Sequence, residues 1–207
     1  MILASASPRR LELLSQAGFR VTVHPANIDE SRLPGESPTD LVRRLAEDKA
    51  HAALRDFASN AFSHVTLAAD TIVWTKDDVL GKPRDPEDAI RMLQGLSGKT
   101  HQVSTGVCLL AQDDGGSLRE CSFVETTAVT FFELGDDEIR AYVATGEPMD
   151  KAGAYGIQDR ARVFVRRIEG DYSNVVGLPV GRVIRELSAL IPHKKGLPAT
   201  LMSLASA

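Results

Sequence analysis

Residues 5–10 (Ser-Ala-Ser-Pro-Arg-Arg) are the first in the chain whose types and spacing could do chemistry. They join a short apolar run to a predicted helix that starts at Pro8. Free N–H groups and the helix dipole make such a start an anion site, and arginine offers the paired donors that phosphate oxygens accept. Two arginines in the first helical turn otherwise oppose the dipole. The segment is therefore either a phosphate site or a solvated helix start with two surface arginines.

A carboxylate follows the apolar run 65–69. Asp70 is predicted to end that strand at a sheet edge, where α/β enzymes commonly place metal ligands or catalytic bases. Asp29 and Glu30, in an acidic loop, could complete a metal site with it. The alternative for Asp70 is a turn residue that caps the backbone of Thr71.

Two lysines and one amide extend this set. Lys49, next to alanine in a predicted helix, is either a phosphate ligand or a surface lysine whose stem covers apolar residues. Lys82 lies in a loop with the sequence Gly-Lys-Pro-Arg-Asp and is either a phosphate ligand or simply exposed. Residues 152–158 are small and rich in glycine, which allows close approach of a ligand, and they end in Gln158, whose amide can pair with a base edge. Such a set suits a nucleoside polyphosphate with a divalent metal, although neither a P-loop nor a dinucleotide-binding glycine motif is present.

Composition narrows the class of protein. The 207 residues include 24 Lys+Arg against 28 Asp+Glu, and 43% are hydrophobic, as in an ordinary globular protein. The net charge of -4 argues against a duplex nucleic acid partner. The two cysteines are expected to be free thiols, and the five scattered histidines show no zinc spacing. With no apolar run of about 20 residues and no signal peptide, we expect a cytoplasmic protein without a membrane partner.

The elements that must position these residues alternate along the chain. Proline follows serine or aspartate at three predicted helix starts, a pattern typical of an N-cap and first helical residue. Apolar periodicity predicts helices over 8–17, 37–54, 136–144 and 178–191 and from 85 onward, and strands over 1–4, 19–24, 65–69, 101–111, 120–131 and 163–168. Residues 71–74 either continue a strand or start a neighbouring one, and 113–116 form a hairpin turn. This order favours an α/β or α+β mixed sheet.

Five ordered motifs resemble the Maf family of nucleoside triphosphate pyrophosphatases: residues 5–10, 68–71, 81–85, 96–103 and 150–158, with 176–179 fitting the C-terminal signature of the family. The resemblance covers residues 1–192 as one domain and leaves 193–207 as a flexible C-terminal tail. It implies an α/β fold like that of inosine-triphosphate pyrophosphatases, with a mixed sheet in two lobes around a central cleft. It also implies a homodimer.

The resemblance implies hydrolysis of a nucleoside triphosphate to the monophosphate and pyrophosphate with Mg²⁺ or Mn²⁺. The catalytic residue of the family falls on Asp70, the metal ligands on Asp70 and Glu30, and the substrate-binding residues on Ser5, Arg9, Arg10, Lys49 and Lys82. Specificity falls on Arg9, Thr71 and Gln158, which resemble the branch that acts on dTTP and UTP. A branch acting on 7-methyl-GTP, which has other residues at these places, is one alternative, and a regulatory binding protein in septum formation is another.

Overall fold

The computed structural model describes residues 1–57, 65–112 and 117–191. Within these ranges the chain is α/β, with seven strands, six α-helices and three 3₁₀ helices. The strands are β1 (Ile2–Leu3), β2 (Thr22–Val23), β3 (Val65–Trp74), β4 (Val79–Leu80), β5 (Thr100–Gln112), β6 (Leu118–Phe131) and β7 (Val165–Glu169). The helices are α1 (Pro8–Gln16), α2 (Pro38–Phe57), α3 (Pro86–Leu96), α4 (Asp136–Val143), η1 (Glu147–Asp150), η2 (Ala152–Ala154), η3 (Arg160–Phe164), α5 (Tyr172–Val176) and α6 (Val180–Leu190).

The seven strands form a mixed sheet. Six follow one another in the order β2-β1-β3-β5-β6-β7, and β4 pairs with β3 off this path. Strand β1 is parallel to both neighbours, with Leu3 opposite Val23 and Leu67. Strand β4 is antiparallel to β3, and β7 is antiparallel to β6. The predicted mixed α/β sheet is confirmed.

The chain divides into two compact units. Unit 1 consists of Met1–Asp70, Thr105–Val124 and the segment that begins at Gly177; unit 2 consists of Thr71–Ser104 and Glu125–Val176. No described helix is both long enough and apolar enough to cross a membrane. The hairpin turn predicted at 113–116 and the tail predicted at 193–207 lie outside the described residues.

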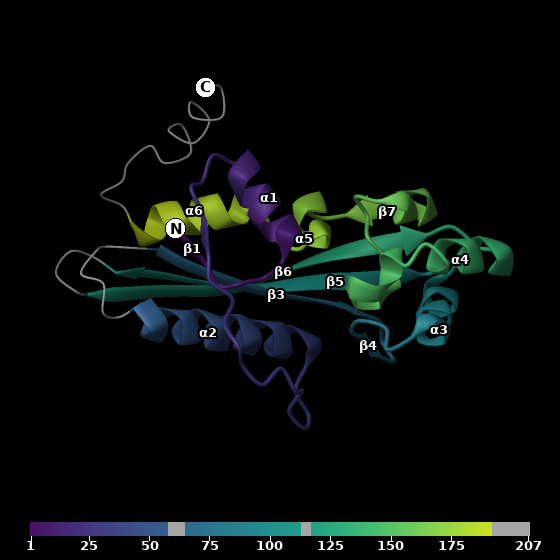
Figure 1. Ribbon diagram of the computed structural model, residues 1–207, viewed down its shortest axis with the longest axis horizontal. Helices are drawn as coiled ribbons and strands as arrows, with labels where there is room; N and C mark the ends of the chain where they lie inside the picture. Colours follow the sequence, from purple (N-terminus) through teal and green to yellow (C-terminus); the bar gives the residue numbers. More distant parts are fainter. Residues whose placement is uncertain (58–64, 113–116, 192–207) are drawn as a thin grey trace. The chain divides into compact units, whose positions relative to one another are not determined.

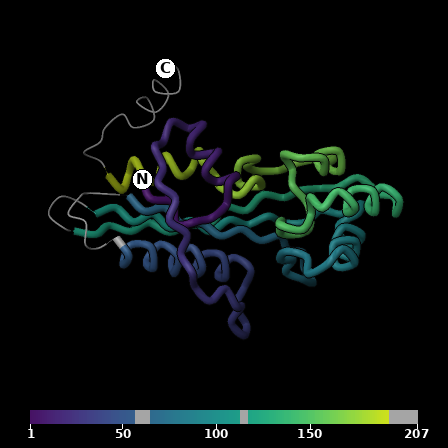
Figure 2. The backbone as a smooth tube through the Cα atoms, in the orientation of Figure 1, coloured from purple at the N-terminus to yellow at the C-terminus, as the bar shows by residue number. Residues whose placement is uncertain are grey.

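Strand pleating separates the core of unit 1 into two layers. Leu67 and Ala69 of β3 join the apolar cluster formed with α1 and α6, whereas Ala68 between them joins the cluster formed with α2. This alternation is expected because successive strand residues point to opposite faces. Figures 1 and 2 accordingly show α2 along one face of the strands of this unit, and α1 and α6 along the other. The layer under α2 is rich in alanine, so the helix lies close to the sheet.

The core of unit 2 contains a cluster of aromatic rings. Phe131 of β6 packs edge-on against Tyr155 and His101, with centroid distances of 4.8 and 4.9 Å. Phe164 connects this group to Tyr142 of α4. Edge-to-face packing at these distances stabilises a core beyond the area that it buries.

Two local predictions need correction, and one helix was missed. Asp70 does not end a strand: β3 continues through it to Trp74, and it pairs with strands on both sides. The physical reason is that residues 71–74 (Thr-Ile-Val-Trp) all favour extended structure. The side chain of Ser7 makes no capping hydrogen bond at α1, whereas Ser37 and Asp85 do accept from backbone N–H groups of α2 and α3. Helix α5 was not predicted, because five residues are too few to show a periodic pattern.

Candidate active site

Arg10 is buried at the start of α1. Its Nη1 donates to Ser5 Oγ at 2.9 Å and its Nε donates to the carbonyl of Gly177 at 2.9 Å. The same Ser5 Oγ accepts from the backbone N–H of Ser7 at 3.2 Å. Only 9% of Arg10 is exposed, and Arg9 beside it is half-buried. Arg10 is therefore not the surface arginine of a solvated helix start.

Lys49 of α2 joins two carboxylates. Its Nζ lies 2.7 Å from Asp70 Oδ1 and 2.6 Å from Glu30 Oε1. The side chains of Lys49 and Asp70 are 10% and 13% exposed, whereas that of Glu30 is 60% exposed. Asp70 has the same strand parity as Ala68 and so points to the α2 face, which explains why a lysine of α2 reaches it. Lys49 is therefore an ion-paired, buried lysine and not a surface one.

Charges of both signs act on Arg10. Burial lowers the pKa of the Arg10 guanidinium, the carboxylates of Asp70 and Glu30 act to raise it, and the positive charge of Arg9 lowers it. These four groups are thus close enough to interact electrostatically. Asp29, in the same loop as Glu30, accepts the N–H of Ser31 on its Oδ1 at 2.9 Å.

Unit 2 contains the remaining predicted residues. Thr71 follows Asp70 in β3, so its side chain points to the opposite face of the strand. Lys82 is exposed, beside a buried Pro83. Its neighbour Gly81 accepts a hydrogen bond from the N–H of Gly153 at 3.0 Å, so the loop of Lys82 is tied to the glycine-rich loop. Gln158, at the end of that loop, is half-buried.

Most of the chain matches one protein family. The model of the family described as "Maf-like protein" matches residues 1–190. The chain belongs to the Maf family. A dTTP/UTP pyrophosphatase of Bacillus cereus (strain AH820) is 49% identical over 187 residues, which are 90% of this chain and 93% of that one. A dTTP/UTP pyrophosphatase of Geobacter sp. (strain M21) is 50% identical over 190 residues, 92% and 95% of the two chains.

Among solved structures, the nucleoside-triphosphatase / dITP/XTP pyrophosphatase of Mycobacterium abscessus is 13% identical, with a TM-score of 0.37 over 92% of this chain and 98% of that one. Because this TM-score is low, the fold assignment depends on the strand order described above and not on this similarity. The predicted membership of the Maf family is confirmed by the family model and by the relatives near 49% identity.

Several residues that shape the Maf motifs were not predicted. Lys151 is buried; its Nζ donates to the carbonyl of Glu147 at 2.7 Å and to Asp150 Oδ1 at 2.8 Å, and lies 3.6 Å from Asp159. A Cβ at Gly156 would lie 2.5 Å from Lys151 Cε, so any larger residue there would displace the Lys151 side chain. The sequence feature that could have identified Lys151 is its place in the motif 150–158, where it lies beside small residues.

The backbone of the same loop takes an unusual course. Gly153 and Ala154 both have positive φ, +68° and +60°, and both are buried. A left-handed alanine costs energy that the surrounding structure must offset. Tyr155 follows, and its hydroxyl shares a 2.8 Å hydrogen bond with Nε2 of His101. The loop that ends in Gln158 is therefore held in one conformation from several sides.

Proposed function

We propose that this Maf-family chain hydrolyses dTTP and UTP to the monophosphate and pyrophosphate. The observation that carries the proposal is the Lys49 ammonium held between the carboxylates of Asp70 and Glu30. Both carboxylates also act to raise the pKa of the buried Arg10. Relatives near 49% identity over nine-tenths of the chain are named dTTP/UTP pyrophosphatases, and they support this substrate class.

The carboxylate pair fits a divalent metal. Mg²⁺ prefers oxygen ligands and is commonly bound by one or two carboxylates together with substrate phosphates. Asp70 and Glu30 supply two such groups whose oxygens meet at a single ammonium. The described residues contain no group of three or more His, Cys, Asp or Glu side chains that could hold a metal ion. In the proposal, phosphate oxygens and water would complete the shell around these two carboxylates. When bound, Mg²⁺ or Mn²⁺ would polarise the phosphate oxygens and favour ionisation of water.

The chain's own residues would divide the remaining work. In the proposed reaction, water attacks the α-phosphorus, the bond to the α–β bridging oxygen breaks, and Asp70 accepts the proton of the water. Arg9, Lys49 and Lys82 would hold the triphosphate and neutralise the charge of the departing pyrophosphate. Arg10 and Ser5 would contribute to substrate binding from their buried positions. The guanidinium of Arg10 is already fixed by two hydrogen bonds.

Base selection is assigned to Gln158, with Arg9 and Thr71 as the other specificity residues. The donor and acceptor of its amide match the O4 and N3–H edge of thymine or uracil. If the Gln158 amide could flip and exchange its donor and acceptor, it would pair with cytosine as well. The fixed course of the loop around Lys151 supports a single orientation.

The family resemblance also extends the proposal to a homodimer, and the net charge of -4 favours an enzyme without a nucleic acid partner. We propose that this enzyme is cytoplasmic. An oxygen-18 experiment tests the reaction class. Hydrolysis of dTTP in labelled water should place the label in the monophosphate, because the attack is at the α-phosphorus. Label in pyrophosphate, or release of orthophosphate with dTDP, would contradict the proposal.

A further inference from the structure

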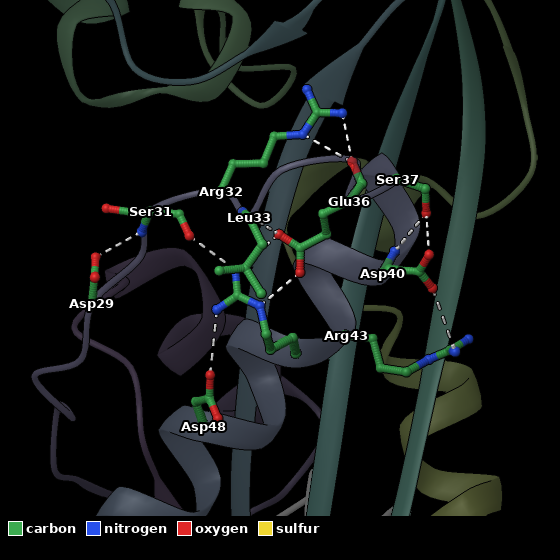
Figure 3. Close-up of polar contacts among 10 residues, drawn as sticks. Asp29, Ser31, Arg32, Leu33, Glu36, Ser37, Asp40, Arg43 and Asp48 are labelled. Carbon is green, nitrogen blue, oxygen red and sulfur yellow. Dashed lines mark hydrogen bonds and ion pairs between the residues drawn. The ribbon is translucent and has the colours of Figure 1, made fainter.

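The loop that carries Glu30 lies between β2 and α2 and contains no helix or strand. Figure 2 shows this segment of the tube leading into α2. A carboxylate on such a loop needs a second anchor if it is to stay beside Lys49, since an exposed side chain alone loses rotamer freedom on pairing. The polar contacts drawn in Figure 3 identify that anchor.

Arg44 of α2 binds the loop through three hydrogen bonds. Its Nε donates to Glu36 Oε1 at 2.6 Å, and its Nη2 donates to Glu36 Oε2 at 2.9 Å and to the carbonyl of Ser31 at 3.0 Å. Figure 3 labels Glu36 and Ser31 among the residues of this group. Glu36 Oε2 also accepts the N–H of Leu33 at 3.0 Å. The carboxylate of Glu36 thus attaches residues 31–36 to the helix through a bidentate contact with arginine, in which charge strengthens both hydrogen bonds.

An ordinary surface salt bridge would do little here, because exposed pairs contribute about 0–1 kcal/mol. This pair differs, since the side chain of Glu36 is 7% exposed and that of Arg44 is 25% exposed. The hydrogen bonds from Arg44 lower the pKa of Glu36 to about 2, so the carboxylate remains ionised at assay pH. Glu36 is not needed to cap α2, because Ser37 Oγ already accepts the N–H of Asp40.

We infer that Glu36 and Arg44 are positioning residues that hold Glu30 against Lys49. Arg44 fixes the carbonyl of Ser31, directly after Glu30, and Lys49, five residues further along the same helix, fixes the Glu30 carboxylate. One rigid helix therefore holds the loop at two points and sets Glu30 relative to Asp70, which shares Lys49. The consequence for turnover rests on the proposed function of Glu30; the consequence for the loop does not.

The first test measures how readily the loop opens, as the rate of its cleavage by trypsin. Trypsin can cut after Arg32, inside the clamped segment, and mass spectrometry follows that one cut. Glu36→Gln and Arg44→Gln should speed the cut by about 10-fold or more, because loops are cut when they open. Arg43→Gln is the matched control, because Arg43 directly precedes Arg44 in α2. Its side chain is 49% exposed, and its Nη1 lies 4.0 Å from Asp40 Oδ1. Unchanged cleavage in both clamp variants would overturn the inference.

The second test measures coupling to Glu30. Arg44→Gln should lower turnover and raise the Mg²⁺ concentration for half-maximal rate by about 10- to 100-fold, the usual cost of losing a partner of a metal ligand. In a Glu30→Gln background the same change should cost less than about twofold, because coupled residues are not additive. Equal losses in both backgrounds would show general destabilisation and overturn the positioning role. If Glu30→Gln alone has no effect, the proposed function of Glu30 fails, while the trypsin result still decides whether the pair holds the loop.

Discussion

Lys49 links the residues on which the proposed chemistry depends. One ammonium beside two carboxylates leaves a net negative charge at that point, and Arg10 lies near enough for its pKa to respond to both carboxylates. At an effective dielectric constant of about 20, one ion pair at about 4 Å is worth roughly 4 kcal/mol before desolvation. Lys49 therefore keeps the carboxylates together before any ligand arrives, which reduces the reorganisation that a substrate must cause.

Replacing Asp70 with Asn tests the proposed base. The amide keeps an oxygen that Lys49 can reach, so we expect little change in the melting temperature. Turnover of dTTP should fall by about 10²-fold or more, because an amide cannot accept the proton of the attacking water. Pyrophosphate release and thermal melting should be measured on one sample. Asp77→Asn, in an exposed turn, is the control, and turnover within tenfold of the original protein would remove Asp70 from this role.

Replacing Gln158 with Ala tests base selection. The preference for dTTP over CTP, measured as the ratio of kcat/KM values, should shrink by about 10-fold or more, since a site that hydrogen-bonds its substrate rejects a mispaired analogue by factors up to about 10⁴. Gln94→Ala, an exposed helical position, should leave the ratio unchanged. An unchanged ratio in Gln158→Ala would show that another group selects the base.

At the scale of elements, the sequence predicted those with strong local signals. The serine cap and proline of α2 and the aspartate cap and proline of α3 placed both helix starts correctly. Asp70 was wrongly predicted to end its strand, because a charged residue inside a strand is unusual unless a tertiary partner compensates it. Lys49 supplies that compensation from a helix 21 residues earlier in the chain, which no local pattern reveals.

The close approach of α2 to the sheet gives an element-scale prediction. A Cβ at Gly106 of β5 would lie 2.1 Å from the backbone carbonyl oxygen of Val42 in α2. Gly106→Ala should therefore shift α2 and lower the free energy of unfolding by about 1–3 kcal/mol. Gly95→Ala is the control, because nothing lies near its added methyl group in α3; it should raise stability by about 0.5–1 kcal/mol. Denaturant melts measure both, and equal stability of the two variants would contradict direct helix–sheet contact.

At the scale of the molecule, the family and fold class were predictable, and the candidate residues were named from ordered motifs. The sequence could not show which of them touch. The pairing of Lys49 with Glu30 and Asp70 and that of Arg44 with Glu36 depend on tertiary packing. His101 was placed in the motif 96–103 and counted among the scattered histidines, but its contact with Tyr155 spans 54 residues and could not be predicted.

The buried histidine predicts a pH dependence of stability. Burial lowers the pKa of His101 to about 4, against about 6.5 in an unfolded chain. Between these values the unfolded state binds more protons, so the free energy of unfolding falls as pH drops from about 6.5 to about 4, by on the order of 3 kcal/mol. Denaturant melts across this range should show that His101→Phe removes this component and that His51→Gln, a half-exposed control, does not. Identical pH profiles for His101→Phe and the original protein would contradict it.

A panel of nucleotides, assayed for pyrophosphate release with Mg²⁺ and with a chelator, tests the proposed hydrolysis of dTTP and UTP most directly. We expect dTTP and UTP to exceed CTP, ATP, GTP and 7-methyl-GTP in kcat/KM by at least about tenfold, and we expect chelation to suppress turnover. CTP or GTP hydrolysed as fast as dTTP would contradict the assignment of the base, and a lack of pyrophosphate from every nucleotide would contradict the proposed enzyme itself.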